Sequence, residues 1–207
     1  MSTTKFALKG SSKCVCDFFE YSLHSLLYQR GLYAPEDFTT VKKYGLPMMF
    51  SIDEEVKNYI RQVMSQVHKW VYRGSVTRLV VPIVDQSTDD VVERWEFVLE
   101  VSEPSSQVRD NNGKPKEEIQ KEIQAIIRQI TASVTFLPAL DDGSYTFSVL
   151  VYGDSKGLGV PTQWVDTKGD GKEVELSQGE KKEVIQFRSF STDNHKVGAF
   201  VSYKIME

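Results

Sequence analysis

The sequence has few of the residues that build covalent or metal-bound sites. Of its 207 residues, only two are cysteines and three are histidines. Cys14 and Cys16 are two positions apart, so on a helix they point to different faces and do not bridge easily. Two thiols without a cluster of other ligands make no zinc site. We therefore expect free thiols in a reducing compartment, with no metal and no cofactor.

The sequence also lacks any apolar run that approaches the length of a membrane-spanning helix. Its first ten residues, MSTTKFALKG, have no signal-peptide core. A net charge of −4 gives no electrostatic reason to expect binding to nucleic acid. We expect a soluble, intracellular protein, and its 40% of apolar residues is enough for one large domain or two small ones.

Catalytic motifs are scarce, with one exception. Neither G-x-x-x-x-G-K-[ST] nor H-E-x-x-H occurs. Residues 153–157 match the G-x-S-x-G nucleophile pattern, and Asp166 and His195 follow in the order typical of α/β-hydrolases. A serine hydrolase with Ser155 as nucleophile is therefore an alternative. The elbow must lead into a helix, however, and the glycines and proline of 157–161 oppose one.

A second partial motif suggests calcium. Asp166, Asp170 and Gly171 stand at positions typical of an EF-hand loop. Lys168 occupies a position where a ligand is needed, and Ser177 replaces the closing glutamate. These two departures argue against calcium binding.

The longest regular pattern lies in residues 115–140. Pro115 suits a first helical turn, and the helix should stop before Pro138. The polar face is either simply solvated or carries a docking patch of Arg128 and Gln129 near Phe136. The apolar face is formed by positions at three- and four-residue steps, namely Ile119, Ile123, Ile126, Ile127, Ile130 and Val134.

Two further helices are expected earlier in the chain. The first begins with Ser11 or Ser12 as N-cap and contains His24, which we expect to be packed or hydrogen-bonded. Ser51 and Glu54 match a capping box that starts the second.

The connection between those helices, residues 32–50, contains Pro35, Gly45 and Pro47 and is predicted to be irregular.

Strand patterns occupy the rest of the chain. Residues 76–84 and 91–101 predict a first hairpin, with Pro82 at an edge or bulge. Residues 145–152 alternate as one strand, and 184–190 with 195–205 predict a second hairpin. Helices combined with antiparallel hairpins indicate an α+β fold.

Long blocks of the sequence resemble the HORMA-domain family. They are FFEYSLHSLLYQRGLY, KYGL, ERWEF, IRQITASVTFLP and RSFSTDNHKV with YKI, and the likeness runs from about Leu8 to Ile205. Within the family the chain is most similar to the spindle-checkpoint branch. The resemblance implies a single HORMA domain over 1–207, with three helices packed on a largely antiparallel sheet. Residues 1–152 would be the core and 153–207 a mobile C-terminal safety belt.

The resemblance also implies a conformational switch. In the open state the terminal hairpin covers the strand edge at 145–152. In the closed state it moves across the sheet, a partner peptide adds as a strand, and the belt wraps over it. The implied edge and belt residues are Trp70, Tyr145, Phe147, Val149, Leu150, Val151, Tyr152, Trp164 and His195.

Partners follow from the same resemblance. They are a coiled-coil kinetochore checkpoint receptor, the activating subunit of the anaphase-promoting complex, and an AAA+ remodelling ATPase. A second copy of the chain would dock through Arg128, Gln129, Phe136 and Trp95. Sequestering the activator delays anaphase without any bond being made or broken by this protein. The expected locations are the nucleus, kinetochore, nuclear envelope and cytoplasm.

Other HORMA adaptors stay open as alternatives, namely a translesion-polymerase subunit or a meiotic chromosome-axis protein. The chain departs from the family pattern between Trp164 and Arg188, where it is longer and richer in glycine and lysine. The contacts of the belt in that segment do not follow from the resemblance.

Overall fold

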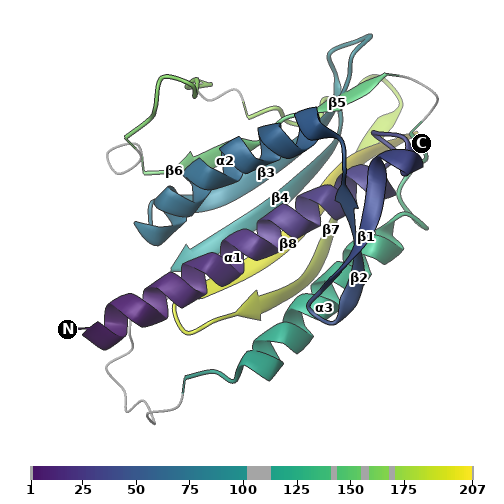
Figure 1. Cartoon of the computed structure of the whole chain (residues 1–207). Helices are drawn as coiled ribbons and strands as arrows, with labels where there is room; N and C mark the ends of the chain where they lie inside the picture. The colour runs from purple at the N-terminus through teal and green to yellow at the C-terminus, as the bar shows by residue number, and fades with distance from the viewer. Residues whose placement is uncertain (1, 102–112, 141–143, 155–158, 168–170, 207) are drawn as a thin grey trace.

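The computed structural model describes residues 2–101, 113–140, 144–154, 159–167 and 171–206. Figure 1 shows the helices packed on one face of a twisted sheet. In chain order the elements are α1 (Ser2–Gln29), a 3-10 turn (Pro35–Asp37), β1 (Phe38–Lys43), β2 (Leu46–Ser51), α2 (Glu54–Tyr72), β3 (Val76–Asp85), β4 (Val91–Val101), α3 (Lys116–Ser133), β5 (Tyr145–Phe147), β6 (Leu150–Gly153), β7 (Glu180–Ser191) and β8 (His195–Met206).

The main sheet is antiparallel throughout, in the order β5–β3–β4–β8–β7. Strand β6 also pairs with β3, on the same side as β5 but farther along the strand. Helix α1 lies between α2 and α3 over the sheet (Figure 1). Its Phe18 makes edge contacts with Phe97 of β4 and Phe190 of β7, at ring separations of 5.9 and 4.9 Å. These buried rings form the centre of the core. None of the described helices is long and apolar enough to cross a membrane.

The first helix starts earlier than the sequence indicated. It runs from Ser2, so the prediction of an N-cap at Ser11 or Ser12 is wrong. One glycine, Gly10, costs a helix about 1 kcal/mol, which is too little to end one that continues on both sides. Ser11 instead bonds to the turn between β7 and β8.

Residues 32–50 are also more regular than expected. They contain most of a β1–β2 hairpin, which reaches from Phe38 to Ser51. Its two-residue turn, Tyr44-Gly45, has φ values of 52° and 73°. Tight hairpin turns need this left-handed backbone, and Asn or Asp usually precedes the glycine. A tyrosine in that position hides the signal.

Two details of the helix ends differ from expectation. The N-cap of α2 is Asp53, whose Oδ1 accepts a hydrogen bond from Val56 N at 2.9 Å. Ser51 accepts from Asp53 N at 3.2 Å and so supports the cap without being it. At the end of α3, Val134 is 42% exposed, whereas the stripe from Ile123 to Ile130 is buried as predicted.

The first predicted hairpin is confirmed as β3–β4, and Pro82 explains an interruption beside it. On the far side of β3, strand β5 pairs as far as Ile83 and β6 begins at Val80. Pro82 lies between these two points and has no N–H to offer. The single strand predicted for 145–152 is accordingly broken at 148–149.

The second predicted hairpin is confirmed as β7–β8, and its position matters for function. Strand β8 pairs with β4 over nine residues, from Glu93 opposite Tyr203 to Val101 opposite His195. The hairpin therefore extends the sheet on the side away from β5 and β6. Within the described residues, no strand pairs with the outer side of β5 or β6.

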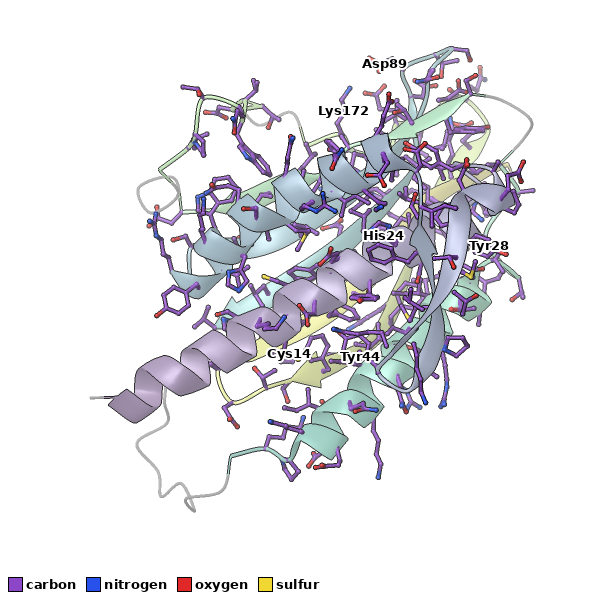
Figure 2. All side chains as sticks on the ribbon, in the orientation of Figure 1. Cys14, His24, Tyr28, Tyr44, Asp89 and Lys172 are labelled. Carbon is purple, nitrogen blue, oxygen red and sulfur yellow. The ribbon has the colours of Figure 1, made fainter. Side chains whose placement is uncertain are left out.

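His24 gives a pH-dependent test of the packing between α1 and β2. It is buried, its Nδ1 accepts from Ser51 N at 3.3 Å, and its ring lies 3.8 Å from that of Phe50 (Figure 2). Burial, and secondarily Lys57, lowers the pKa of His24 from 6.5 to about 4. The unfolded chain therefore binds this proton first as the pH falls. Folding stability is retained above pH 6.5 and lost between there and about pH 4.

We expect this loss to reach about 3 kcal/mol at pH 4, at 1.4 kcal/mol per pKa unit. Urea unfolding at several pH values measures it. His24→Gln keeps an acceptor for Ser51 N but cannot titrate, so its stability should fall less over the same interval. Equal losses in the two proteins would show that His24 is not the responsible group.

Candidate functional site

The outer side of β6 opens onto a groove. Alternate backbone N–H and C=O groups of an edge strand point away from its neighbour, where another strand can pair. A cavity of about 280 Å3 separates β6 from residues 160–167, and one of about 870 Å3 lies between α2, residues 148–150 and 163–167. The two cavities share lining residues and form one groove along the edge. The shared residues are Val149, Leu150, Trp164, Val165 and Thr167.

Two tryptophans close this groove on its outer side. Trp70 of α2 is buried, and the ring of Trp164 meets it edge to face at 4.8 Å. Trp164 N donates to Pro161 O at 2.9 Å, so a tight turn presents the indole. An aromatic pair of this geometry contributes roughly 0.5–1.5 kcal/mol beyond its buried area. Trp164 thereby fastens 159–167 to α2 with the strand edge beneath.

The wall on the α2 side combines polar and apolar groups, and the sequence analysis missed it. Its residues are Tyr59, Arg61, Gln62, Val63, Ser65, Gln66 and Lys69. Gln62, Gln66 and Lys69 recur at four- and three-residue steps and so lie on one face of α2, near Trp70. This spacing is the feature of the sequence from which the wall could have been predicted. With Val160 opposite, the groove suits an extended chain that carries both apolar and polar side chains.

Most of the predicted edge residues do meet here. The groove is lined by Trp70, Val149, Leu150, Val151, Tyr152 and Trp164. Tyr145 and Phe147 belong to β5, at the adjoining end of the same edge. The Phe147 ring packs against Tyr59 of α2 at 5.6 Å.

His195 lies apart from the other predicted residues, because the structure places it in the terminal hairpin and not at this edge. It lies at the start of β8, opposite Val101 of β4, and is fully buried. Its Nδ1 is 2.5 Å from Ser11 Oγ, which also contacts Thr192 Oγ1. Burial lowers the pKa of His195. Its position joins the β7–β8 turn to α1.

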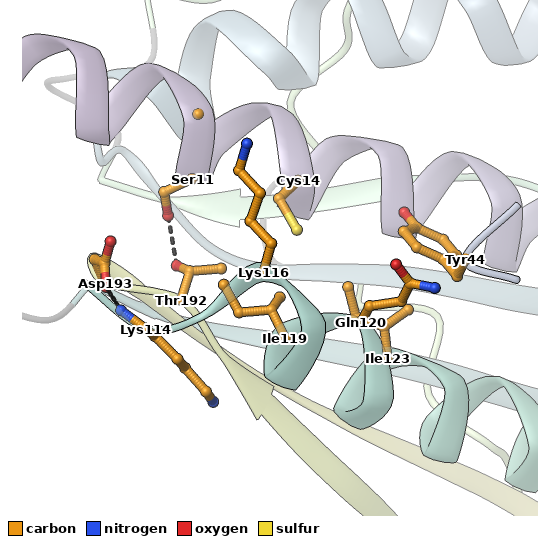
Figure 3. A pocket seen from close by; sticks show the side chains of 11 residues that line it. Ser11, Cys14, Tyr44, Lys114, Lys116, Ile119, Gln120, Ile123, Thr192 and Asp193 are labelled. Atoms are coloured by element: carbon orange, nitrogen blue, oxygen red, sulfur yellow. Dashed lines mark hydrogen bonds between the residues drawn. The ribbon is translucent and has the colours of Figure 1, made fainter. Parts of the chain in front are cut away.

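A separate cavity of about 410 Å3 lies beside that joint, between α1 and α3. Figure 3 shows Cys14 extending from α1 toward Ile119 and Ile123 of α3. Burial, with Asp17 as the second cause, raises the pKa of the Cys14 thiol and so disfavours its nucleophilic form. Both cysteines are free, as expected. This cavity shares no lining residue with the groove at β6.

The predicted docking residues fall into two groups. Arg128 is exposed on α3, and Phe136 is 46% exposed just beyond it. Gln129 Oε1 instead accepts a hydrogen bond from a backbone N–H of β7 at 2.7 Å. Trp95 is 1% exposed and stacks on Phe187 at 5.6 Å, so it can act on a partner only from beneath. The docking role of all four stays a prediction.

Two alternatives from the sequence fall on undescribed positions. Ser155, the hydrolase nucleophile, lies outside the described residues, as do Lys168 and Asp170 of the calcium-like loop. Residues 159–167 that follow Ser155 form turns and irregular chain without a helix.

Comparisons with known proteins agree on one family. The HORMA domain model matches residues 11–195. The mitotic spindle checkpoint component mad2 of Schizosaccharomyces pombe is 47% identical over 98% of this chain and 96% of its own length. A chain in the crystal structure of the mitotic checkpoint complex superimposes with a TM-score of 0.83 at 45% identity, covering 95% of this chain and 99% of that one.

More distant structures share the fold alone. Caenorhabditis elegans HTP-1, solved bound to the HIM-3 closure motif, has a TM-score of 0.70 at 13% identity, over 95% of this chain and 91% of that one. The checkpoint relatives belong to a signalling family without enzymatic activity, so no catalytic role is assigned to this chain. The extent and level of these matches place the chain in the HORMA-domain family, among the mitotic spindle checkpoint proteins.

Proposed function

We propose that this chain captures an extended segment of a partner protein as an additional strand on the outer edge of β5 and β6. The observation that carries the proposal is the groove along that edge, closed by the Trp70–Trp164 contact. Main-chain hydrogen bonds supply much of the affinity in this mode, and pockets for alternate side chains supply specificity. Residues 159–167 and 171–179, which belong to the connection between β6 and β7, form a belt, and 159–167 pass over the captured strand.

The position of the terminal hairpin supports this proposal. Because β8 pairs with β4, the β7–β8 hairpin does not compete for the peptide edge. We infer that this arrangement corresponds to the closed state of the switch. In the open state the same hairpin covers 145–152, and the two states differ by a few kcal/mol, so partners select between them.

The proposed partner peptide comes from the activating subunit of the anaphase-promoting complex or from the coiled-coil kinetochore receptor. Holding the activator delays anaphase. The belt must lift before the peptide leaves, so dissociation is slow. We further propose that an AAA+ ATPase reopens the closed protein. We also propose that the protein described here acts at kinetochores and the nuclear envelope, in the nucleus and in the cytoplasm.

Alternate N-methylation of the peptide tests strand addition. Only every second N–H of an added strand faces the edge. One N-methylated set should therefore lose at least about 100-fold in affinity, as several ladder bonds are removed. The complementary set should bind within a few-fold of the unmodified peptide. Fluorescence anisotropy with a labelled activator peptide measures both, and equal affinities would contradict strand addition.

Arg128→Ala should weaken self-association while leaving peptide capture intact. The Arg128 side chain is exposed on α3. Helix α3 contacts β7, which lies at the opposite edge of the sheet from β6. Losing one exposed arginine from an interface typically costs about 1–2 kcal/mol, roughly tenfold in the dimerisation constant. Sedimentation velocity measures the dimer, and anisotropy measures the peptide.

Lys121→Ala is the matched control, because Lys121 is also an exposed cation on α3. It should change neither measurement. Gln129→Ala is a poorer probe, since Gln129 also holds β7. If Arg128→Ala abolished capture and self-association together in a folded protein, docking and capture would not use separate faces.

A further inference from the structure

The belt is held at a second place, on the face of the sheet away from the helices. Along β4 the side chains alternate, with Glu93 and Trp95 facing the helices and Arg94 facing the other way. Arg94 is nevertheless buried, because belt residues 171–174 lie against it. Arg94 Nε donates to Gly171 O at 3.2 Å.

The guanidinium of Arg94 gathers charged and polar groups from three parts of the chain. Its Nη2 lies 3.2 Å from Glu173 Oε1 of the belt and 3.4 Å from Tyr152 Oη of β6. Its Nη1 pairs with Glu96 of β4. The fork thus joins the middle of the sheet, the belt and the peptide edge strand in one cluster.

Gly171 lies close to the Tyr152 hydroxyl. A Cβ at this position would lie 2.7 Å from Tyr152 Oη, so the tyrosine side chain would have to shift to admit one. The Tyr152 hydroxyl itself is 3.5 Å from Gly171 O. The belt backbone therefore lies against the side chain of Tyr152, whose backbone belongs to the strand that borders the groove.

Apolar and ionic contacts extend the attachment on both sides. Val174 is buried in a small second core with Val84 and Val91. Lys172 Nζ is 3.7 Å from Asp89 Oδ1 beyond the end of β3 (Figure 2). Val174 thus anchors residues 171–174 by hydrophobic contact, beside the hydrogen bonds and ion pair of the Arg94 guanidinium.

We propose that Arg94 is the buckle of the belt, a positioning residue that fixes residues 171–174 and sets how long a captured peptide stays bound. This inference rests on the proposed function for its second half. Residues 159–167 can lift from the peptide only when the chain behind them gains slack. The attachment at 171–174 limits that slack, so loosening it speeds peptide dissociation more than it changes association.

Amide hydrogen exchange in the free protein tests the buckle without any ligand. Arg94→Lys keeps the charge but loses the fork, so amides in 171–176 should exchange about tenfold faster. Arg78→Lys is the control, because Arg78 pairs with the same Glu96 at 2.9 Å from β3 and its loss removes no bond to 171–173. If exchange at 171–176 is unchanged in Arg94→Lys, the proposal that Arg94 fixes this part of the belt is wrong.

Peptide dissociation tests the link to capture. Arg94→Lys should release a labelled activator peptide about tenfold faster at a similar association rate. Glu173→Gln, at a site 57% exposed, should do so by about threefold because solvent screens its charge. Glu175→Gln, an exposed neighbour in the same segment, should match the wild type.

The outcomes separate the two proposals. Faster exchange at 171–176 with unchanged peptide dissociation overturns the role in retention. A wild-type protein that captures no peptide overturns the proposed function, and the exchange experiment still decides whether Arg94 fastens the belt.

Discussion

Trp164→Ala is expected to weaken peptide capture by about 100-fold, which corresponds to roughly 2.7 kcal/mol. Truncating a tryptophan that holds a bound partner typically costs about 2 kcal/mol or more, and Trp164 is only half-buried, so the loss should lie near the low end of that range. The substitution removes the contact with Trp70 that holds 159–167 over the groove. Most of the loss should appear as faster dissociation, measured by anisotropy after adding unlabelled competitor.

Thr162→Ala is the matched control for that experiment. Thr162 is exposed in the same turn and lines neither cavity of the groove, so its truncation should change dissociation by less than about twofold. The melting temperature of the control should stay near that of the wild type. That of Trp164→Ala should fall modestly, because Trp164 packs against Trp70 at the border of the main core. A Trp164→Ala protein that held the peptide as long as wild type would mean that residues 159–167 do not retain it.

Glu93→Gln should destabilise the fold by about 3–5 kcal/mol. Glu93 and Arg30 form a buried pair, with Arg30 Nη2 at 2.9 Å from Glu93 Oε2 and Nε at 3.0 Å from Oε1. Arg30 also donates to Pro138 O at 2.7 Å, and Trp95 Nε1 donates to Glu93. Removing the carboxylate leaves a buried guanidinium uncompensated. Urea unfolding at pH 7 measures the loss.

Two further variants test whether the lost folding stability comes from the buried charge. Glu100 lies on β4, as Glu93 does, and forms an exposed ion pair with Lys196 of β8. Glu100→Gln removes this pair and should cost less than about 1 kcal/mol. The double variant Arg30→Met with Glu93→Leu should recover much of the Glu93→Gln loss, because no unpaired charge stays inside. If Glu93→Gln cost no more than Glu100→Gln, the Arg30–Glu93 pair would not hold the residue that follows α1 to β4.

The parts of the fold that the sequence predicted are those in which local pattern and tertiary packing agree. The Ile123–Ile130 stripe is buried because helical spacing alone brings it to one face. The β3–β4 and β7–β8 hairpins follow from alternation with turn residues between the strands. Tertiary context overrides local pattern at Pro82, where a missing N–H on β3 breaks the strand on the neighbouring side.

The site was predicted from resemblance more than from pattern. Trp70 and Trp164 are 94 positions apart, and no periodicity predicts their contact. Burial of Arg94 was not predictable either, since alternation on an antiparallel strand places an arginine in solvent. The belt covers it, and the belt is the segment in which the sequence departs from the family pattern. His195 belongs to the predicted C-terminal segment, but its part of the hairpin contacts α1, away from the peptide edge.

Hydrogen exchange on adding the activator peptide tests the central claim most directly. In the closed arrangement, amides of 145–153 and 159–167 should become protected together, because the peptide pairs with the edge and the belt is held over it. Amides of β8, already paired with β4, should change little. Protection confined to α3, with the β5–β6 edge and the belt unchanged, would contradict capture at this edge.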